Sequence, residues 1–591
     1  MSENSSSPEK IGYTMIVSMV TVSVFLTQFI FRSLDDNRLT NWQWTFIGVD
    51  INRILLILVF GTIAAYLFSK SAFPERNPSS FLFFSSFIAC VFFWKEPEVI
   101  VDVSRYFTYA KHLEIYGVKY FLQEWGRGIN AWTDLPLAPF LYGIIFKFLG
   151  ESRLYIQIFT TFLFSMTVVL TYKTGKILWD EETGFFAGIA LLGMPYLFTQ
   201  VPLMLVDVPA MFFFMLSIFT FIRAIDEGGI RMITFSAIAL FMAFFSKYST
   251  WLMLSVLAVI FMVYLIQSTG NKAQNTPSLT LPPRGGGQGW GGSRLKTQSY
   301  IYRPALIILI AGFFIGVVIL FKFDVISGQI KFLQEYQEPG LKRWEESFVS
   351  TFLFQIHPFI TSAALYSFYA AFKKRDLRYA IISWLVILVF VLQIKRIRYI
   401  IMVFPMLALM ASYGLREIRD KEMRRFIIAC AVMSSLVVAI FVYLPFLEKM
   451  SAVNLKNAGM FLNAIDAENI EVLTISSVDD VVNQAVSVPI LDLFTEKNIF
   501  YRYEEGSLPA PEKFKESPLR FTWEYKNPAY YSLADNLNKK NQAVVLISSD
   551  YGKIPLTYED KIKSFRIKKV FETSENVFNY KTFITVYYKK K

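Results

Sequence analysis

Four short polar motifs stand out in a chain that is otherwise rich in apolar residues. Asp102 directly follows a hydrophobic segment, and Asp207 and Lys247 each lie where a long apolar run begins or ends. The fourth motif, KRIRY from Lys395 to Tyr399, places three cations within four residues beside another apolar run. A carboxylate can accept a proton from an attacking group, and Lys and Arg side chains can hold an anion such as a phosphate.

Each of these motifs also has a purely structural explanation. Asp102 and Asp207 can cap the helices that start beside them, because an Asp side chain accepts hydrogen bonds from free backbone N–H groups. Lys247 can extend its ammonium group to lipid head groups. The motif at 395–399 can be a solvated turn. The sequence alone leaves these alternatives open.

The composition is that of a polytopic membrane protein. Of the 591 residues, 54% are hydrophobic and 18% are charged, and the mean hydropathy is +0.41; soluble domains carry about 25% charged residues. The net charge of +12 does not indicate a nucleic-acid partner, because most of the excess falls in loops assigned to one side of the membrane. Cys90 and Cys430 both lie in apolar segments, so no disulfide framework is expected.

Apolar runs predict about thirteen membrane-spanning segments. Their approximate ranges are 11–31, 54–73, 81–97, 153–173, 183–199, 205–222, 232–247, 249–268, 304–322, 351–372, 379–394, 399–415 and 426–444. With the N-terminus in the cytoplasm, the loops on that side carry the clusters of Lys and Arg that the positive-inside rule requires. The odd number of spans then places the C-terminal part outside, with Asp102. We expect a multi-pass protein of a plasma or bacterial inner membrane, with this orientation.

The segment from Glu96 to Gly150 is predicted to form two helices on the outer surface. From Val103 onward, apolar residues recur at the spacing of a helix, at Tyr106, Phe107, Ala110, Leu113 and Gly117. A second apolar helix follows, with Thr133 or Asp134 as its cap and Gly150 at its end. At about 14 residues it is too short to cross a hydrocarbon core about 30 Å thick.

Two further regions differ from the pattern of spans. Residues 269–303 contain the stretch TPSLTLPPRGGGQGWGGSR, which predicts a flexible, low-complexity cytoplasmic insertion. Residues 446–591 mix charged residues with short β-rich runs, which predicts a small extracytoplasmic α/β domain after a transmembrane domain at 1–445. Strands are expected at Ile470–Ser476, Ala543–Ser548 and in a hairpin around Val570–Tyr588, and helices at Asn454–Ile465 and Tyr530–Lys540.

Several motifs follow one another in a characteristic order. They are an Asp just outside a span, the surface segment PLAPFLYGIIFKFLG, and the span-flanking sequences LVDVP, FSKY and RYIIMVFP. This order resembles the GT-C superfamily of polytopic glycosyltransferases, in the branch that contains the protein mannosyltransferases and the lipid A aminoarabinose transferases. The resemblance covers residues 80–445. Within the superfamily, this part of the sequence is most similar to the dolichyl-phosphate-mannose-protein mannosyltransferase-like family.

The resemblance implies a mainly α bundle that transfers a single hexose or pentose from a polyprenyl phosphate on the outer face of the membrane, with inversion. It also implies that the acid of the first outer loop, here Asp102, acts at the reacting centre, where it would serve as the base. The candidate ligands of the donor phosphate are Lys247, Arg396, Arg398 and Tyr399, and the candidate substrate contacts are Asp207 and Arg105.

The sequence indicates no certain cofactor, and a divalent metal is possible without any residue pattern that supports it. Many relatives have an Asp-Glu pair in the first outer loop, whereas this chain has Asp102 followed by Val103, so a site with two adjacent carboxylates is missing. His112 and His357 are the two histidines of the chain, which argues against a His-rich zinc site. Both are expected to form local hydrogen bonds.

The expected partners are the lipid-linked donor, a protein, lipid or glycan acceptor, and the surrounding membrane lipids. Two other function classes share many of these features. A flippase for lipid-linked sugars would have many spans and cationic contacts to the lipid phosphate, but no need for a base at Asp102. A non-catalytic scaffold would use the domain at 446–591 to bind partners. An oligosaccharyltransferase of the same superfamily would need further acids and a larger outer domain.

Overall fold

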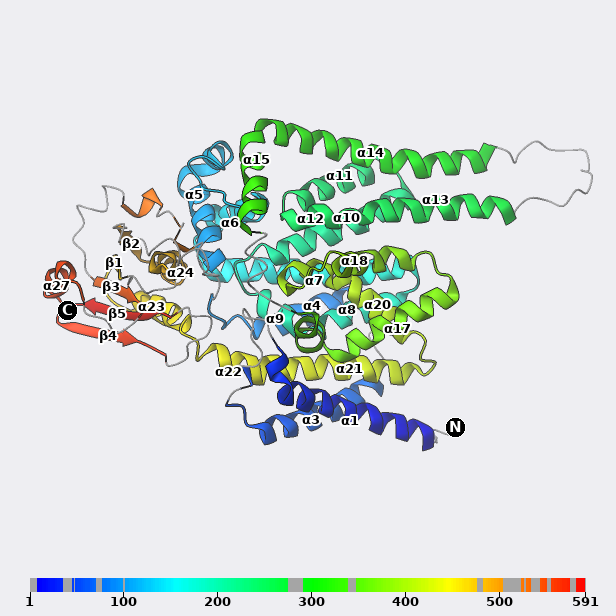
Figure 1. Cartoon of the computed structure of the whole chain (residues 1–591), viewed down its shortest axis with the longest axis horizontal. Coiled ribbons are helices and arrows are strands. Elements are labelled where there is room, and N and C mark those ends of the chain that lie inside the picture. The colour runs from blue at the N-terminus through cyan, green and yellow to red at the C-terminus, as the bar shows by residue number, and fades with distance from the viewer. Residues whose placement is uncertain are drawn as a thin grey trace, which may run out of the picture.

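The computed structural model has a large helical bundle with a small sheet domain at one end (Figure 1). It describes residues 8–35, 45–46, 48–70, 77–98, 101–274, 291–337, 347–475, 482–502, 522–523, 525, 528–532, 543–549, 554–573 and 581–589. The mainly α fold class with a small C-terminal α/β domain is confirmed.

Among the described residues, eight helical segments are long and apolar enough to cross a membrane. They lie on α1 (Pro8–Ile30), α3 (Ile51–Lys70), α7 (Arg153–Leu178), α10 (Asp207–Glu227), α12 (Tyr248–Met253) with α13 (Val256–Gln274), α14 (Gly291–Phe321), α19 (Ile397–Ile400) with α20 (Phe404–Leu415), and α21 (Lys421–Val438) with α22 (Leu444–Leu447).

The other predicted spans also fall on helices, but these have only 12 to 17 residues. They are α4 (Pro78–Val91), α8 (Glu181–Leu192), α11 (Ile230–Phe244), α17 (Pro358–Lys374) and α18 (Tyr379–Val391). A helix needs about 17–25 residues to span a bilayer, so the total of about thirteen spans stays a prediction.

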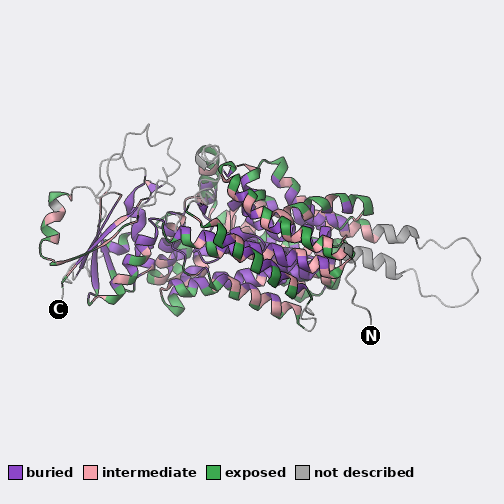
Figure 2. Cartoon of the chain, turned by 90° about the horizontal axis from the view of Figure 1, so that it is seen from below, coloured by how far each residue is buried: buried purple, intermediate pink, exposed green. Residues whose placement is uncertain are grey.

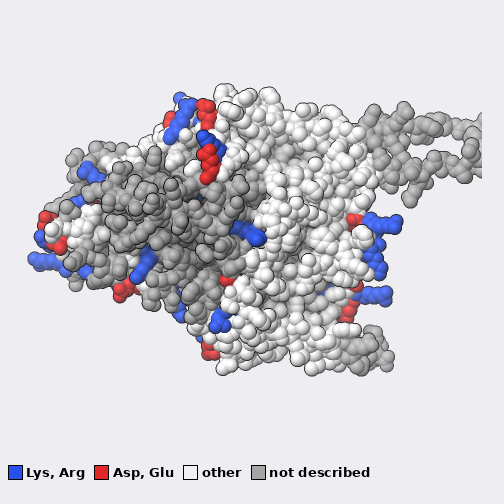
Figure 3. Space-filling model, viewed as in Figure 1, with Lys and Arg blue, Asp and Glu red and all other residues white. Residues whose placement is uncertain are grey.

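The outer surface of the bundle is suited to lipid. Figure 3 shows a broad band without charged side chains, with Lys, Arg, Asp and Glu at the two ends of the molecule. Large apolar side chains such as Phe60, Leu309 and Phe313 are 63–68% exposed on this bundle. The buried residues form a continuous interior along the helices (Figure 2). An exposed apolar surface of this extent indicates an integral, multi-pass membrane protein.

The two predicted surface helices are present at the end of the bundle that carries the sheet domain. They are α5 (Val101–Glu124) and α6 (Leu137–Leu149), and α5 runs across the ends of the long helices (Figure 1). Gly117 has φ +86° and kinks α5, and Gly150 ends α6 at φ +100°. The predicted cap of α6 is wrong, because Pro136 holds the cap position and no side chain makes a cap hydrogen bond there.

The low-complexity segment is helical at its two ends. α13 extends to Gln274 and α14 starts at Gly291, and residues 275–290 lie outside the described residues. After α14, the chain turns into α15 (Phe323–Phe332), which lies beside α5 and α6 at the end of the bundle (Figure 1). The predicted insertion at 269–303 is therefore helical at both flanks.

The C-terminal part contains a mixed five-stranded sheet with the order β2-β1-β3-β5-β4. β1 pairs in parallel with β2 and β3, and β5 pairs antiparallel with β3 and β4. The elements are α23 (Val453–Ala464), β1 (Asn469–Ile475), α24 (Ser487–Leu493), β2 (Asn498–Tyr501), β3 (Ala543–Ser548), α27 (Leu556–Ile562), β4 (Ile567–Phe571) and β5 (Phe583–Tyr588). The predicted strands, hairpin and first helix are confirmed, and β2 and α24 were not predicted. Most of the helix expected at 530–540 lies outside the described residues.

This domain is fastened to α5 rather than loosely tethered. The Ser104 hydroxyl donates to the carbonyl of Val486 at 2.5 Å, and the Lys111 ammonium pairs with Asp492 on α24 at 2.5 Å. Lys111 also pairs with Glu151 at 3.1 Å, so one buried cation ties α5, α24 and the segment after α6 together. Removing the whole domain would uncover α5, and it would therefore not test the domain's role cleanly.

The packing of α17 against α20 generates a prediction about Gly414. A Cβ atom added at Gly414 would lie 2.1 Å from the backbone carbonyl oxygen of Ala363, whereas a Cβ at Gly316 on α14 would meet nothing within 4 Å. We expect Gly414→Ala to lower the free energy of unfolding by roughly 1–3 kcal/mol or more, the usual cost of overpacking. Gly316→Ala should be neutral or slightly stabilising, since Ala favours a helix more than Gly does. Thermal unfolding in detergent measures both, and equal effects of the two variants would contradict the close approach.

Candidate active site

Residues from four distant parts of the chain meet beside the C-terminal domain. Asp102 lies in the first turn of α5, Asp207 is the first residue of α10, and Lys247 directly precedes α12. Arg398 lies in the short helix α19. The helix ends in this region therefore bring together the acids and cations that the sequence placed at separate span boundaries.

Asp207 forms the centre of this cluster. Its Oδ1 atom accepts a hydrogen bond from Nζ of Lys247 at 2.6 Å, and its Oδ2 atom accepts one from Nε of Arg398 at 2.8 Å. The Asp207 side chain is fully buried, and those of Lys247 and Arg398 are 14% and 9% exposed. The N-cap position of α10 belongs to Val206 and not to Asp207, and the Asp207 carboxylate instead joins two cations from other parts of the chain.

Asp102 lies between two arginines. Its Oδ1 atom is 2.7 Å from Nη2 of Arg105, and its Oδ2 atom accepts a hydrogen bond from Nη1 of Arg398. Burial alone would raise the pKa of Asp102, but the two guanidinium groups outweigh this effect and hold its pKa well below the usual range. Asp102 is thus a carboxylate at neutral pH, and Arg398 bridges it to Asp207.

Asp134 is a member of this cluster that the sequence indicated only as a helix cap. Its carboxylate lies 3.3 Å from Nε of Arg105 and accepts a hydrogen bond from the Tyr106 hydroxyl at 3.2 Å. Burial raises the pKa of Asp134, because Arg105 offsets only part of the cost of desolvation. Trp132, which has φ +47°, places its ring 5.4 Å from the Arg105 guanidinium. No periodicity in the sequence could have shown that this loop folds back onto α5.

Tyr399 lies between two of the predicted phosphate ligands. Nζ of Lys247 is 4.9 Å from the centre of the Tyr399 ring, and the guanidinium carbon of Arg396 is 5.4 Å from it. Both of these contacts are made by the face of the Tyr399 ring, and the predicted role of Tyr399 as a ligand of the donor phosphate stays a prediction. Cation–π attraction therefore helps to hold both cations near the cluster.

The segment that leads into Asp207 is held by a buried ion pair. Nε of Arg153 contacts Oε1 of Glu98 at 2.9 Å, and both carboxylate oxygens of Glu98 accept from the backbone N–H of Met204 at 3.3 Å. The Tyr142 hydroxyl donates to the carbonyl of Leu205 at 2.5 Å. These contacts set the backbone immediately before Asp207. Glu98 and Arg153 carry no motif or spacing in the sequence that marks them as part of this region.

The arrangement suits the binding of an anion next to a carboxylate. Three carboxylates, from Asp102, Asp134 and Asp207, face the cations Arg105, Lys247, Arg398 and Arg396. The cluster therefore carries one excess positive charge and several donors with fixed positions. Charge-assisted hydrogen bonds of this kind are the usual means of holding a phosphate.

The remaining polar candidates behave as local structural groups. Nδ1 of His112 bonds to the carbonyl of Thr108 at 2.7 Å, and Nε2 of His357 bonds to the Ser434 hydroxyl at 2.8 Å. Within the described part of the chain, no group of three or more His, Cys, Asp or Glu side chains is placed to hold a metal ion.

The low pKa of Asp102 predicts how its ion pairs respond to pH. Because the folded-state pKa is lowered, their stabilisation is complete above the ordinary Asp pKa of about 3.9 and is lost only as the pH falls below it. We expect Asp102→Asn to lower the free energy of unfolding by up to about 3 kcal/mol, since it weakens a buried ion-pair network. This difference should be constant from pH 8 to pH 5 in thermal unfolding experiments. A difference that already shrinks near pH 6 would contradict the lowered pKa.

Residues 134–281 match the model of the family described as dolichyl-phosphate-mannose-protein mannosyltransferase. No curated protein matches the chain by sequence.

Solved structures match the chain at low sequence identity. The structure of ArnT from Cupriavidus metallidurans bound to undecaprenyl phosphate is 10% identical, with a TM-score of 0.50, and the match covers 87% of this chain and 98% of that one. The archaeal oligosaccharyltransferase AglB from Archaeoglobus fulgidus, in complex with an inhibitory peptide and a dolichol-phosphate, is 12% identical, with a TM-score of 0.44 and coverage of 80% and 70%. The fold comparison rests on the first of these. Residues 134–281 are therefore similar to the dolichyl-phosphate-mannose-protein mannosyltransferase family, and the chain has a fold similar to that of ArnT.

Proposed function

We propose that the chain transfers one sugar, a hexose or a pentose, from a polyprenyl-phosphate donor to a hydroxyl or amine of a protein, lipid or glycan acceptor. The observation that supports this proposal best is the contact of Arg398 with both Asp102 and Asp207. It places an anion-binding group directly beside a carboxylate that can act as a base. A sugar phosphate needs both groups within reach of one carbon atom.

In this proposal the donor phosphate binds to Lys247 and Arg398, with Arg396 adding positive charge nearby. Asp207 does not touch the sugar, because its side chain is fully buried and both its oxygens are already bonded. It acts as a positioning residue that keeps the two cations fixed while negative charge develops on the leaving phosphate. Preorganised donors of this kind are among the largest contributions to catalysis.

Asp102 is the proposed base. In the cluster the positive charges of Arg398 and Arg105 stabilise the Asp102 carboxylate. This keeps the pKa of Asp102 low and makes Asp102 a weak base. When the donor phosphate takes over hydrogen bonds from Arg398, Asp102 loses part of this stabilisation and its pKa rises toward the range in which it can accept a proton. Donor binding would thus activate the base at the moment when a substrate is present.

The proposed sugar transfer needs only the donor, the acceptor and Asp102. The bond between the anomeric carbon and the phosphate oxygen breaks, and its electron pair leaves with the polyprenyl phosphate. The acceptor oxygen or nitrogen attacks the anomeric carbon from the opposite face, and its proton passes to Asp102. Attack from that face inverts the anomeric configuration.

The proposed orientation places this reaction outside the cytoplasm. The end opposite the C-terminal domain displays several Lys and Arg side chains (Figure 3), and the positive-inside rule assigns such an end to the cytoplasm. The candidate site and the sheet domain then lie on the extracytoplasmic side. The polyprenyl chain would lie against the exposed apolar faces of the spans.

The first experiment measures release of free polyprenyl phosphate from a panel of radiolabelled polyprenyl-phosphate sugars. Membranes with the wild-type chain and with Asp102→Asn, at matched expression and with native extract as acceptor, are compared. We expect release by the wild type only, because Asn cannot accept the acceptor's proton. Release by both would keep the transferase but reduce Asp102 to a structural residue. Translocation of the head group without cleavage would favour a flippase, and no release across the panel would contradict the proposed reaction.

Substitution of the cations tests the phosphate site separately. Lys247→Ala and Arg398→Ala should each lower turnover by about 10²–10³, the usual effect of removing one preorganised charged donor. Arg398→Lys keeps the charge but cannot bridge two carboxylates, so we expect an intermediate loss. Lys176→Ala is the matched control, because Lys176 forms an exposed ion pair with Glu181 away from the cluster. Near-normal turnover of a folded Lys247 or Arg398 variant would remove that residue from the proposed site.

A further inference from the structure

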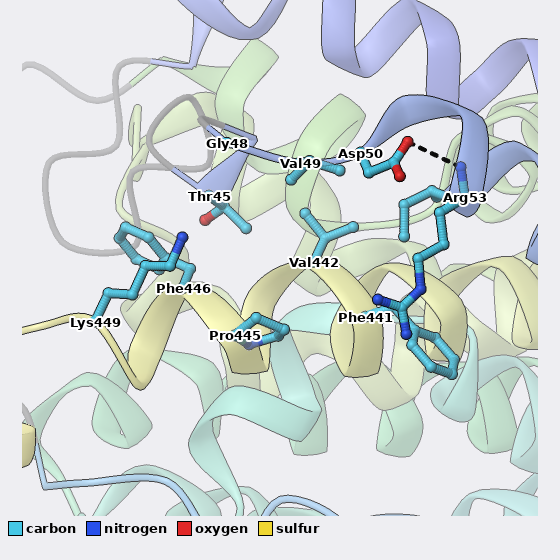
Figure 4. A pocket seen from close by; sticks show the side chains of 11 residues that line it. Thr45, Gly48, Val49, Asp50, Arg53, Phe441, Val442, Pro445, Phe446 and Lys449 are labelled. Atoms are coloured by element: carbon cyan, nitrogen blue, oxygen red, sulfur yellow. Dashed lines mark hydrogen bonds between the residues drawn. The ribbon is translucent and has the colours of Figure 1, made fainter.

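A pocket away from the candidate active site lies between the segment before α3, the start of α3 and the end of α22. It has a volume of about 330 Å³ and is lined by Thr45, Gly48, Val49, Asp50, Arg53, Ile54, Phe441, Val442, Pro445, Phe446 and Lys449. Figure 4 shows Lys449 at one end of the pocket and Arg53 at the other, with Val442 and Pro445 between them. None of these residues belongs to the candidate active site. The pocket is near the start of α3 and the end of α22, at the end of the bundle where the chain continues into the sheet domain (Figure 1).

The cations of this pocket have no ion-pair partner among the described residues. Arg53 and Lys449 are both exposed, and neither forms a salt bridge within 4 Å. The acid of the pocket is Asp50, whose Oδ1 atom accepts a hydrogen bond from the backbone N–H of Arg53 at 3.2 Å. Asp50 therefore caps α3 and leaves the Lys449 end of the pocket with a net positive charge.

The wall of the pocket also contains a buried hydroxyl without a partner. Thr45 is 1% exposed, and its Oγ1 atom has no hydrogen-bond partner in the described structure. In Figure 4 this hydroxyl lies toward the Lys449 end of the pocket. A buried hydroxyl that makes no hydrogen bond is unfavourable, so Oγ1 of Thr45 is available to bond with a group that enters the pocket.

The backbone at Gly48 and the apolar residues that line the pocket fit a ligand with a charged head group joined to apolar chains. Gly48 has φ +76°, and a Cβ atom there would lie 3.7 Å from Nζ of Lys449, so the loop passes close to the ammonium group. Ile54, Val442 and Phe446 form a buried apolar floor. Beside the pocket, Leu56 on α3 and Phe441 are 58% and 41% exposed. A ligand that binds here would contact lipid-facing surface with its apolar part.

We propose that this pocket binds an anionic phospholipid, with the lipid phosphate at Lys449 and Thr45. The phosphate oxygens accept hydrogen bonds from the Lys449 ammonium and the Thr45 hydroxyl, and Arg53 adds positive charge from the opposite end. The acyl chains pass over Phe441 and along the exposed face of α3. The bound lipid adds further contacts between α3 and α22 to the apolar packing of Ile54, Val442 and Phe446. This inference is independent of the proposed transferase reaction.

The test uses the full chain in phosphatidylcholine nanodiscs with a trace of phosphatidylglycerol that carries a diazirine in one acyl chain. After illumination, mass spectrometry measures labelling of the peptides that contain residues 51–60 and 441–449. We expect unlabelled phosphatidylglycerol to prevent this labelling and phosphatidylcholine not to prevent it. Lys449→Gln should reduce the labelling about tenfold and Thr45→Val about threefold, because a hydrogen bond to a charged group is stronger than one between neutral groups.

A matched control and a mild variant keep the result interpretable. Lys331→Gln should leave the labelling unchanged, since Lys331 on α15 is also an exposed cation, with a 72% exposed side chain, but lies outside the pocket. Thr45→Val removes the hydroxyl but keeps the shape of the side chain. It therefore tests the site even if Lys449→Gln folds poorly. Equal labelling by a diazirine-bearing phosphatidylcholine, or no response to Lys449→Gln and Thr45→Val, would show a general lipid contact and overturn the proposal. Displacement by undecaprenyl phosphate but not by phosphatidylglycerol would also overturn it.

Discussion

The buried carboxylate of Asp207 is the group on which the rest of the candidate site depends. An ionised side chain with no exposure to solvent is stable only when other charges and hydrogen bonds compensate it. Here Lys247 and Arg398 supply that compensation from two other parts of the chain. The ends of α10, α12 and α19 must therefore meet at one point. While Nε of Arg398 bonds to Asp207, Nη1 of the same guanidinium donates a hydrogen bond to Asp102 on the surface helix α5.

The surface helix α5 is in turn fixed from both sides. Its N-terminal turn is tied to the bundle through Asp102 and Arg398, and its outer side is tied to the C-terminal domain through Ser104 and Lys111. A carboxylate held in this way has little freedom to move, which suits a group that must meet a reacting centre with defined geometry. The C-terminal domain thus supports the candidate site, although among its described residues none enters the cluster around Asp207.

Two groups of cations at this end of the molecule differ in their surroundings. Lys247 and Arg398 are almost fully buried and paired with carboxylates, so an entering phosphate must compete with those carboxylates for them. Arg53 and Lys449 are exposed and unpaired within the described structure, beside lipid-facing surface. The first environment suits a substrate that binds, reacts and leaves, and the second suits a lipid that stays bound.

The sequence by itself determined the class of the molecule and singled out most of the charged residues of the candidate site. Long apolar runs allow few structures besides membrane-spanning helices, and the few Asp, Lys and Arg residues at the edges of these runs stand out in the sequence. Asp102, Asp207, Lys247 and Arg398 could therefore be singled out without knowledge of their contacts. Only the tertiary structure decided which of them bond to each other, and that Asp134 joins them through Arg105. It also decided that Asp207 holds cations rather than capping its helix. These contacts join residues that are up to 296 positions apart, and periodicity and spacing carry information only about neighbours along the chain.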